Sequence, residues 1–258
     1  MNNRLRGLVS SGRPAFGLWS MLSDPTIVEM IADAGFDYVG VDLEHSSLEI
    51  QEARNHLRAA GARGLGHIVR MSTHDPSSIV RVLDMGAEGI LVTHVKDAAD
   101  ASAIIAAARY TPIGHRGTAR TIPAGDFGSQ ELSMRTLTKW FNEQVVVGLM
   151  VEDASAVDDI DAIVKIHGLD MIQIGATDLA ASLGYLGEVD HPEVGAAMDK
   201  VRVACLGANL ALAFTVGHPS YSMTSSDLVE KGYRMLICGT DMAIMMWALT
   251  ETARRVKV

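Results

Sequence analysis

Between residues 36 and 45 the chain reads Phe36-Asp37-Tyr38-Val39-Gly40-Val41-Asp42-Leu43-Glu44-His45, so that an apolar run passes directly into charged side chains. Three further segments end in the same way: His67–Arg70, Val145–Glu152 and Met171–Asp178. A short β-branched apolar run is typical of a strand buried on both faces, as in a parallel sheet. In parallel α/β folds the chemistry lies just beyond the carboxyl ends of the strands. The four endings therefore predict an active site of carboxylates, an imidazole and a guanidinium.

Eight such runs are spaced along the chain, with segments of helical periodicity between them. They are Ala15–Trp19, Phe36–Val41, His67–Arg70, Gly89–Thr93, Val145–Val151, Met171–Gly175, Ala211–Val216 and Met235–Cys238. Asp24-Pro25, Asp75-Pro76 and His191-Pro192 each open a helix with proline in its first turn. This alternation over 258 residues predicts a single (β/α)8 barrel domain, residues 1–258. A doubly wound open sheet is the alternative, because counting strands does not show that a sheet closes.

The composition is that of an ordinary globular protein, with 48% hydrophobic and 21% charged residues. The net charge of −9, with no basic stripe, argues against a nucleic-acid partner. Residues 1–6 lack the apolar core of a signal peptide, and no run approaches the roughly 20 apolar residues of a membrane span. Cys205 and Cys238 lie outside any Cys-x-x-Cys pattern and are typical of small buried side chains. We therefore expect a cytoplasmic protein with no membrane partner.

Glu152 and Asp178 end successive predicted strands, so in a barrel they would lie at neighbouring positions on the rim. Two carboxylates with waters suit Mg²⁺ or Mn²⁺. Two unrelated surface acids would fit the same placement, since every strand end of a barrel is polar. The sequence has no Gly-x-Gly-x-x-Gly after an early strand, no P-loop and no His-x-x-x-His, so nucleotide binding and zinc hydrolase chemistry have no support.

Arg70 emerges directly from an apolar strand, so its guanidinium needs a partner. It suits bidentate recognition of a carboxylate or a developing enolate oxygen, and a structural ion pair with Glu44 or Asp42 fits the spacing equally well. His45 lies three residues after Asp42, whose carboxylate would orient the ring for proton transfer. A hydrogen-bonded loop histidine is the plainer alternative. His94 also stands at a strand end, where it could face the site.

Two segments depart from the repeating pattern. The connection 110–130 is long, and it carries His115, Arg116 and Arg120, the densest positive charge near the expected mouth of the barrel. The final helix is apolar around its whole circumference from residue 242 to 249. It could be buried deep in the protein or packed into a neighbouring subunit. We favour the second, because terminal helices of barrels are peripheral and methionine-rich surfaces often contact partners.

In their order along the chain, these motifs resemble the metal-dependent pyruvate aldolases of the HpcH/HpaI family, which cleave 4-hydroxy-2-oxo acids. The resemblance covers nearly the whole chain. Its motifs include Gly17-Leu18-Trp19, Asp42-Leu43-Glu44-His45, Val69-Arg70, Leu83-Asp84-Met85-Gly86, Arg109-Tyr110-Thr111-Pro112, Arg116-Gly117, Val151-Glu152, Gly175-Ala176-Thr177-Asp178-Leu179 and Gly239-Thr240-Asp241. The chain departs from the family at Thr93 and Ala176, where proline is usual.

The resemblance implies a TIM barrel of the phosphoenolpyruvate/pyruvate-binding type whose last helix, about residues 242–256, is swapped between the subunits of a hexamer. It implies that Glu152 and Asp178 bind a divalent cation (Mg²⁺, Mn²⁺ or Co²⁺) that chelates a small keto acid. Arg70 would stabilise the pyruvate enolate.

The resemblance also assigns the remaining site residues. His45, helped by Asp42 and by Asp84 from another subunit, would relay the proton of the substrate's 4-hydroxyl. The backbone of Gly175, Ala176 and Thr177 would cradle the pyruvate carboxylate.

The implied reaction is reversible cleavage of a 4-hydroxy-2-oxo acid, of the 2,4-dihydroxyhept-2-ene-1,7-dioate or 2-keto-3-deoxy sugar acid type, to pyruvate and an aldehyde. A citrate-synthase-like condensing transferase on the same scaffold is an alternative, and Arg116 and Arg120 would suit its polyanionic acceptor. A non-catalytic barrel that binds a keto acid is a third possibility.

Overall fold

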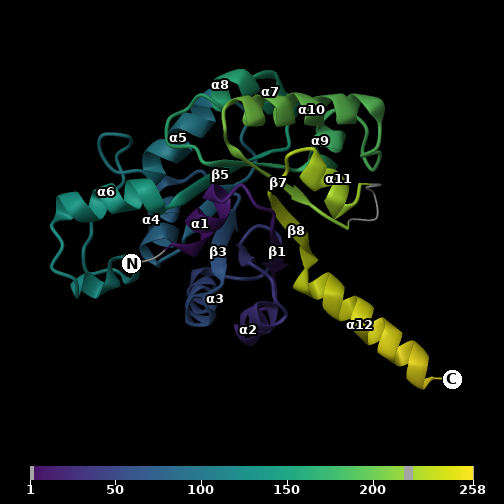
Figure 1. Ribbon diagram of the computed structural model, residues 1–258, viewed down its shortest axis with the longest axis horizontal. Coiled ribbons are helices and arrows are strands. Elements are labelled where there is room, and N and C mark those ends of the chain that lie inside the picture. The colour runs from purple at the N-terminus through teal and green to yellow at the C-terminus, as the bar shows by residue number, and fades with distance from the viewer. Residues whose placement is uncertain (1–2, 218–222, 258) are drawn as a thin grey trace.

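The computed structural model describes residues 3–217 and 223–257, so the outermost ends of the predicted domain and residues 218–222 lie outside the described residues. Eight parallel strands close into a barrel in sequence order, and β8 pairs with β1 (Figure 1). The strands are β1 (Ala15–Ser20), β2 (Tyr38–Asp42), β3 (Gly66–Met71), β4 (Gly89–Val92), β5 (Val146–Val151), β6 (Met171–Ile174), β7 (Ala211–Thr215) and β8 (Met235–Thr240). Each of the eight predicted runs forms a strand, and closure excludes the open sheet.

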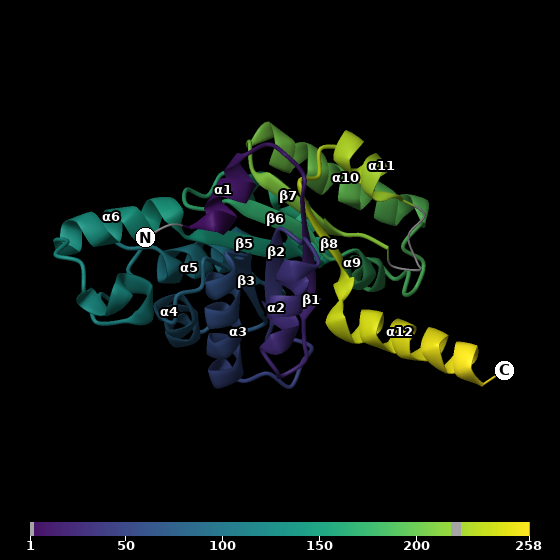
Figure 2. The same ribbon diagram turned by 60° about the horizontal axis from the view of Figure 1, so that its bottom comes forward.

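Helices surround this barrel (Figure 2). They are α1 (Arg4–Ser10), α2 (Thr26–Asp33), α3 (Ile50–Arg63), α4 (Pro76–Asp84), α5 (Ala98–Ala108), η1 (Pro123–Gly128), α6 (Met134–Gln144), α7 (Ala154–Asp158), α8 (Ile160–Ile163), α9 (Ala176–Ser182), α10 (Pro192–Gly207), α11 (Ser225–Glu230) and α12 (Asp241–Val256). Two of the three predicted caps are present: Asp75 accepts a hydrogen bond from the Ser78 amide at 2.8 Å, and His191 accepts one from the Glu193 amide at 3.3 Å. Each cap satisfies an amide that the first turn leaves without an intrahelical partner. At Asp24-Pro25 the prediction is wrong by one residue, because Pro25 itself is the capping residue of α2 and makes no side-chain cap hydrogen bond.

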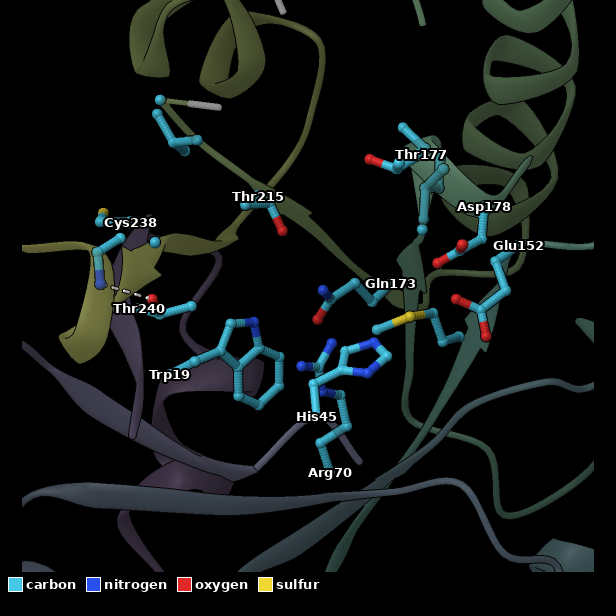
Figure 3. A pocket seen from close by; sticks show the side chains of 18 of the residues that line it. Trp19, His45, Arg70, Glu152, Gln173, Thr177, Asp178, Thr215, Cys238 and Thr240 are labelled. Carbon is cyan, nitrogen blue, oxygen red and sulfur yellow. Dashed lines mark hydrogen bonds between the residues drawn. The ribbon is translucent and has the colours of Figure 1, made fainter. Parts of the chain in front are cut away.

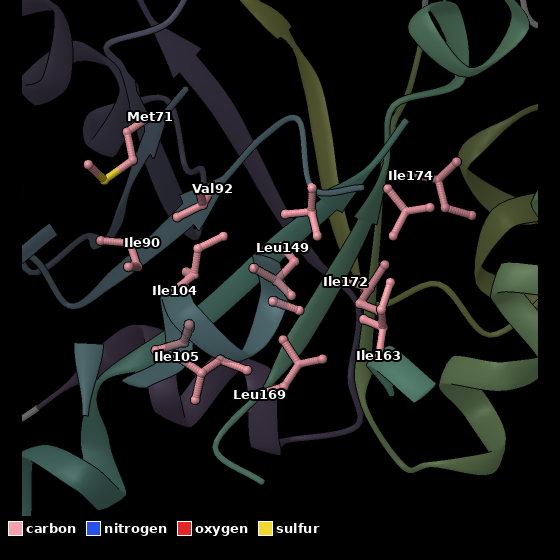
Figure 4. Close-up of a cluster of buried hydrophobic side chains, with 14 of the residues drawn as sticks. Met71, Ile90, Val92, Ile104, Ile105, Leu149, Ile163, Leu169, Ile172 and Ile174 are labelled. Atoms are coloured by element: carbon pink, nitrogen blue, oxygen red, sulfur yellow. The ribbon is translucent and has the colours of Figure 1, made fainter. Parts of the chain in front are cut away.

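Alternation along each strand divides the buried side chains into two layers. One layer packs between strands and helices, where Ile104 and Ile105 of α5 lie over Leu149 and Ile172 (Figure 4). The other layer fills the barrel and is joined by Leu5 of α1. This inner layer comprises Leu5, Ala15, Trp19, Tyr38, Ile68, Leu91, Val146, Met150, Met171, Ala213, Met235 and Ile237.

The same two-residue step carries polar side chains inward at the carboxyl ends of the strands. Arg70 follows Ile68 by two positions, Glu152 follows Met150, and Gln173 follows Met171. Glu152 and Gln173 are buried although their side chains are polar. Strand geometry therefore places the site at this end of the barrel interior.

Helix α12 extends away from the barrel (Figures 1 and 2). Its exposed side chains include Met246 at 65% and Trp247 at 67%. Burial of this apolar helix within its own subunit is therefore excluded, whereas packing against another subunit stays a prediction. Within residues 3–217 and 223–257, no helix has the length and apolar character needed to cross a membrane.

Candidate active site

A cavity of about 630 Å³ opens at the carboxyl ends of the strands (Figure 3). The predicted site residues that line it are His45, Arg70, Glu152, Gly175, Ala176, Thr177 and Asp178. Asp42 and Asp84 are not among the lining residues. Asp42 is fully buried beside Arg70, and Asp84 ends α4. Folding thus brings together the predicted metal ligands, the guanidinium and the imidazole.

Arg70 is held by a bidentate ion pair with Asp42. Its Nε donates to Oδ1 at 2.9 Å and its Nη2 donates to Oδ2 at 2.5 Å. The guanidinium carbon lies 4.5 Å from the centre of the Trp19 ring, and Nε lies 3.4 Å from Glu44 Oε2. The structural ion pair allowed by the sequence is therefore present. Because this pair fixes the guanidinium at the cavity wall, it is also compatible with substrate recognition.

The His45 ring points into the cavity, but its carboxylate neighbour differs from the expected one. Its Nε2 lies 3.8 Å from Glu44 Oε2, and its side chain is 60% exposed. Asp42 instead accepts a hydrogen bond from the backbone amide of His45 at 3.4 Å. The expected contact between the Asp42 carboxylate and the His45 ring is wrong for this subunit. The reason is register: Asp42 and Arg70 lie opposite each other on β2 and β3, so Arg70 takes both carboxylate oxygens.

Glu44 connects several of these groups, and its side chain is only 5% exposed. Its Oε1 accepts a hydrogen bond from the Thr93 hydroxyl at 2.5 Å and lies 2.9 Å from His94 Nε2. The His94 amide donates to Glu152 Oε1 at 2.8 Å, and the ring Nδ1 lies 3.3 Å from the same oxygen. His94 therefore contacts the carboxylates of both Glu44 and Glu152, although it is not among the residues that line the cavity.

Glu152 carries the clearest electrostatic perturbation of the site. Burial raises the pKa of its carboxyl to about 7; the His94 amide opposes this shift, while the Glu44 and Asp178 carboxylates reinforce it. Gly175 makes room for this side chain, since a Cβ there would lie 2.6 Å from Glu152 Oε2. Asp178 follows in the first turn of α9. Glu152 and Asp178 face one cavity, where the charge of Asp178 disfavours ionisation of Glu152. Carboxylate oxygens are the ligands that a divalent cation prefers, so these two residues fit the implied ion.

Gly175, Ala176 and Thr177 line the cavity beside Asp178 at the start of α9. This is the position that the resemblance assigns to the pyruvate carboxylate, and that role stays a prediction.

No residue of the connection 110–130, which the structure describes in full, lines the cavity, so this connection does not supply the positive charge expected at the mouth. Arg116 Nη2 donates to Asp84 Oδ1 at 2.7 Å, and the Arg116 side chain is fully buried. Its guanidinium carbon lies 4.8 Å from the Tyr110 ring centre. Arg120 donates to the Gln130 carbonyl at 2.9 Å, within the same connection. The prediction for Arg116 is wrong because its side chain is buried between the nearby Tyr110 ring and the carboxylate of Asp84, which is distant in the sequence.

Sequence reasoning missed Trp19 and Gln173, which both line the cavity (Figure 3). It named Glu44 only as an alternative partner of Arg70. The two-residue alternation along β1 and β6 would have identified both missed side chains as inward-facing. The contacts of Glu44 had no comparable signal, because Glu44 follows the end of its strand.

Comparison with known proteins gives consistent matches over this architecture. The family model described as HpcH/HpaI aldolase/citrate lyase matches residues 15–246. The 4-hydroxy-2-oxo-heptane-1,7-dioate aldolase of Shigella sonnei (strain Ss046) is 30% identical over 99% of this chain and 95% of its own length. The hydroxypyruvate/pyruvate aldolase of Pseudomonas aeruginosa is 31% identical over 99% of this chain and 93% of its own.

Two solved structures extend the comparison. An HpcH/HpaI aldolase/citrate lyase family protein from Burkholderia cenocepacia J2315 has a TM-score of 0.90 and 30% identity, with 100% of both chains covered. Citrate synthase SbnG has a TM-score of 0.86 and 29% identity, with 98% of this chain and 97% of that chain covered.

Proposed function

The chain belongs to the HpcH/HpaI aldolase/citrate lyase family, and from this premise we propose that it is a divalent-metal-dependent aldolase. It reversibly cleaves a 4-hydroxy-2-oxo acid to pyruvate and an aldehyde. The observation that carries this proposal is the meeting of Arg70, Glu152, Asp178 and His45 around one cavity. These groups supply the cation ligands, the anion stabiliser and the proton carrier that such a cleavage needs.

Glu152 and Asp178 would hold the ion, which we propose is Mg²⁺, Mn²⁺ or Co²⁺. When bound, the ion supplies Lewis-acid polarisation of the substrate's 2-oxo group. Glu152 must lose its proton to act as a ligand, and its pKa of about 7 makes this step sensitive to pH near neutrality.

Arg70 would stabilise the negative charge that develops on the 2-oxo oxygen as the carbon–carbon bond breaks. The two hydrogen bonds to Asp42 and the contact with the Trp19 ring hold its guanidinium in one direction before substrate binds. Preorganised donors of this kind lower a barrier because they do not have to reorient during the reaction.

His45 would accept the proton of the 4-hydroxyl in the cleavage direction and return it in synthesis. Its exposed ring reaches the cavity, and the Glu44 carboxylate 3.8 Å away would stabilise the imidazolium that forms. We propose that Asp84 acts from a neighbouring subunit, because within its own subunit it contacts Arg116 instead of lining the cavity.

The backbone of Gly175, Ala176 and Thr177 would bind the pyruvate carboxylate. We propose a substrate of the 2,4-dihydroxyhept-2-ene-1,7-dioate or 2-keto-3-deoxy sugar acid type, in keeping with the Shigella sonnei relative. The cavity of about 630 Å³ is of the size that binds small molecules.

We also propose that the chain forms one domain that assembles into a cytoplasmic hexamer through α12. The exposed apolar side chains of this helix support an interface, because a surface helix in contact with water alone normally presents polar residues. Both cysteines are free thiols, in keeping with a reducing compartment.

The test is exchange of pyruvate's methyl protons for deuterium, followed by NMR with Mg²⁺, Mn²⁺ or Co²⁺ and then with a chelator. We expect exchange that needs the metal and is abolished in Asp178→Ala. The matched control is Asp161→Ala, which removes an exposed carboxylate from α8 and should exchange like the wild type. Equal exchange with and without metal, or unchanged metal affinity and turnover in Asp178→Ala, would contradict the assignment.

A condensing transferase is the second candidate, favoured by the similarity to citrate synthase SbnG. Burial of Arg116 against Asp84 removes one of the cations expected to bind its polyanionic acceptor. Incubation with acyl-CoA and oxaloacetate, against pyruvate and a panel of aldehydes, separates the two activities. Binding of keto acids without either turnover would indicate a non-catalytic barrel.

A further inference from the structure

Glu44, His94 and Glu152 form a cluster just beyond the carboxyl ends of β2, β4 and β5. Each offers one ligand atom, and the three atoms lie within 4.8 Å of one another. Both glutamate side chains are 5% exposed, whereas the His94 side chain is 55% exposed and has space to adjust. Among the described residues, Asp178 is not part of this cluster.

The two oxygens of Glu152 face different neighbours. Oε1 accepts the His94 amide hydrogen bond at 2.8 Å, whereas Oε2 faces Gly175, close enough that a Cβ there would lie 2.6 Å away. Gly175 is three residues before Asp178 in the same turn of chain. The Oε1 side is therefore distinct from the side that leads to the proposed Glu152/Asp178 ion.

The two carboxylate oxygens of Glu44 also face different neighbours. Oε2 lies 3.4 Å from Arg70 Nε, so its charge is already balanced on that side. Oε1 receives the Thr93 hydroxyl and lies 2.9 Å from His94 Nε2. The Oε1 atoms of the two glutamates and a ring nitrogen of His94 thus converge from three separate segments of the chain.

The backbone holds His94 in this position at some conformational cost. His94 has a φ of 59°, a left-handed conformation that is uncommon for residues other than glycine. The preceding Thr93 carbonyl is bonded to His74 Nε2 at 2.9 Å, and the His94 amide is bonded to Glu152. Such strained residues persist where the surrounding contacts determine them, often at functional sites.

From this geometry we propose that Glu44, His94 and Glu152 bind a second divalent cation, Zn²⁺, with Glu152 bridging to the Glu152/Asp178 site. An imidazole nitrogen with two carboxylates favours Zn²⁺ or Co²⁺ over Mg²⁺, which prefers oxygen ligands. The inference goes beyond the proposed aldolase, since binding at this site requires no substrate.

The test uses Co²⁺ as a spectroscopic probe and Zn²⁺ for stoichiometry, both in excess Mg²⁺ so that the Glu152/Asp178 site is filled. A histidine bound to Co²⁺ shows a strongly shifted, exchangeable ring N–H resonance in proton NMR. The variant is His94→Asn. Asparagine tolerates the left-handed backbone conformation and keeps the backbone N–H that donates a hydrogen bond to Glu152. The control is His167→Asn, which changes an exposed histidine.

We expect the shifted resonance in the wild type, in His167→Asn and in Asp178→Asn, and its loss in His94→Asn. Loss of a residue that only orients a metal ligand lowers metal affinity by about 10- to 100-fold. Because His94→Asn removes a ligand itself, Zn²⁺ affinity at this site should fall by more than that range. Urea unfolding of metal-free protein checks that the fold of the variant is intact.

A resonance that is absent from the wild type, or that persists in His94→Asn, would overturn the proposal and leave His94 as a hydrogen-bonded bridge between the two carboxylates. A single ion whose binding needs both His94 and Asp178 would also overturn it, because the sites would then be one. Pyruvate exchange with Mg²⁺ is measured separately, so loss of that activity beside an intact His94 resonance would contradict only the proposed function.

Discussion

Replacing Gly175 by alanine tests the geometry that the cation site depends on. The backbone at Gly175 has a φ of −91° and a ψ of 78°, close to the inverse γ-turn conformation, which alanine can adopt, so the main effect comes from the added methyl group. That Cβ would lie 2.6 Å from Glu152 Oε2, 2.8 Å from Glu152 Cβ and 3.1 Å from Met150 Sδ. Rotation of the carboxylate relieves only the first contact. The clash with Glu152 Cβ requires a shift of the strand end itself.

Overpacking of this kind in a buried site costs about 1–3 kcal/mol of unfolding free energy. The same shift moves Glu152 relative to Asp178, and misplacing one ligand should weaken Mn²⁺ binding by at least about tenfold, or about 1.4 kcal/mol. Gly175→Ala should therefore lose stability and metal affinity together.

The assays are urea unfolding of the metal-free protein and calorimetric titration with Mn²⁺. Gly195→Ala is the control, because this glycine lies within α10 and the added methyl group would meet no neighbouring atom within 4 Å. It should gain up to about 1 kcal/mol of stability and keep the wild-type affinity. Gly175→Ala with wild-type stability and wild-type Mn²⁺ affinity would refute the argument.

Three further predictions follow from single contacts. Arg70→Lys keeps the charge but loses the fork that pairs with Asp42, so metal-dependent pyruvate exchange should fall about 100-fold; wild-type exchange would favour a purely structural pair. Burial raises the pKa of Glu152 from 4.5 to about 7, so the protonated form is the one that the fold favours. Metal-free wild type should therefore lose up to ~3 kcal/mol of stability relative to Glu152→Gln as the pH rises from 4.5 to above 7, while Mg²⁺ affinity rises over the same window; a pH-independent difference in urea unfolding would contradict the shift. Trp247→Asp places a charge on the exposed face of α12, so light scattering should detect dissociation into smaller species, and an unchanged mass would argue against this helix as an interface.

Local patterns in the sequence were sufficient for the eight strands, and they favoured a barrel over an open sheet without showing that the sheet closes. Each strand was visible because a strand buried on both faces needs a continuous apolar run, and each predicted run ended where polar side chains reach solvent or the cavity. Closure was predicted from the repeated alternation of strands and helices, and the pairing of β1 with β8 confirmed it. The helix caps were equally local, since a cap and its amide lie two or three residues apart.

The identity of the ion-pair partners could not be obtained in that way. Asp42 stands three residues from His45 in sequence, yet its carboxylate pairs with Arg70, which the β2–β3 register places directly opposite. Arg116 was expected at the mouth, yet it lies buried against Asp84. Spacing along the chain states which groups can meet, whereas strand register and packing determine which of them do.

Periodicity and motif order within short segments identified the eight strands, the family and several of the side chains that face the cavity, but not Trp19 or Gln173. The packing of the barrel was needed to show that Glu44 lies between Arg70 and His94, and that His94 reaches Glu152. These residues come from separate strand ends. Their contacts depend on differences of an ångström or two in how neighbouring strands are paired, and electrostatic interactions between buried groups change steeply over such distances.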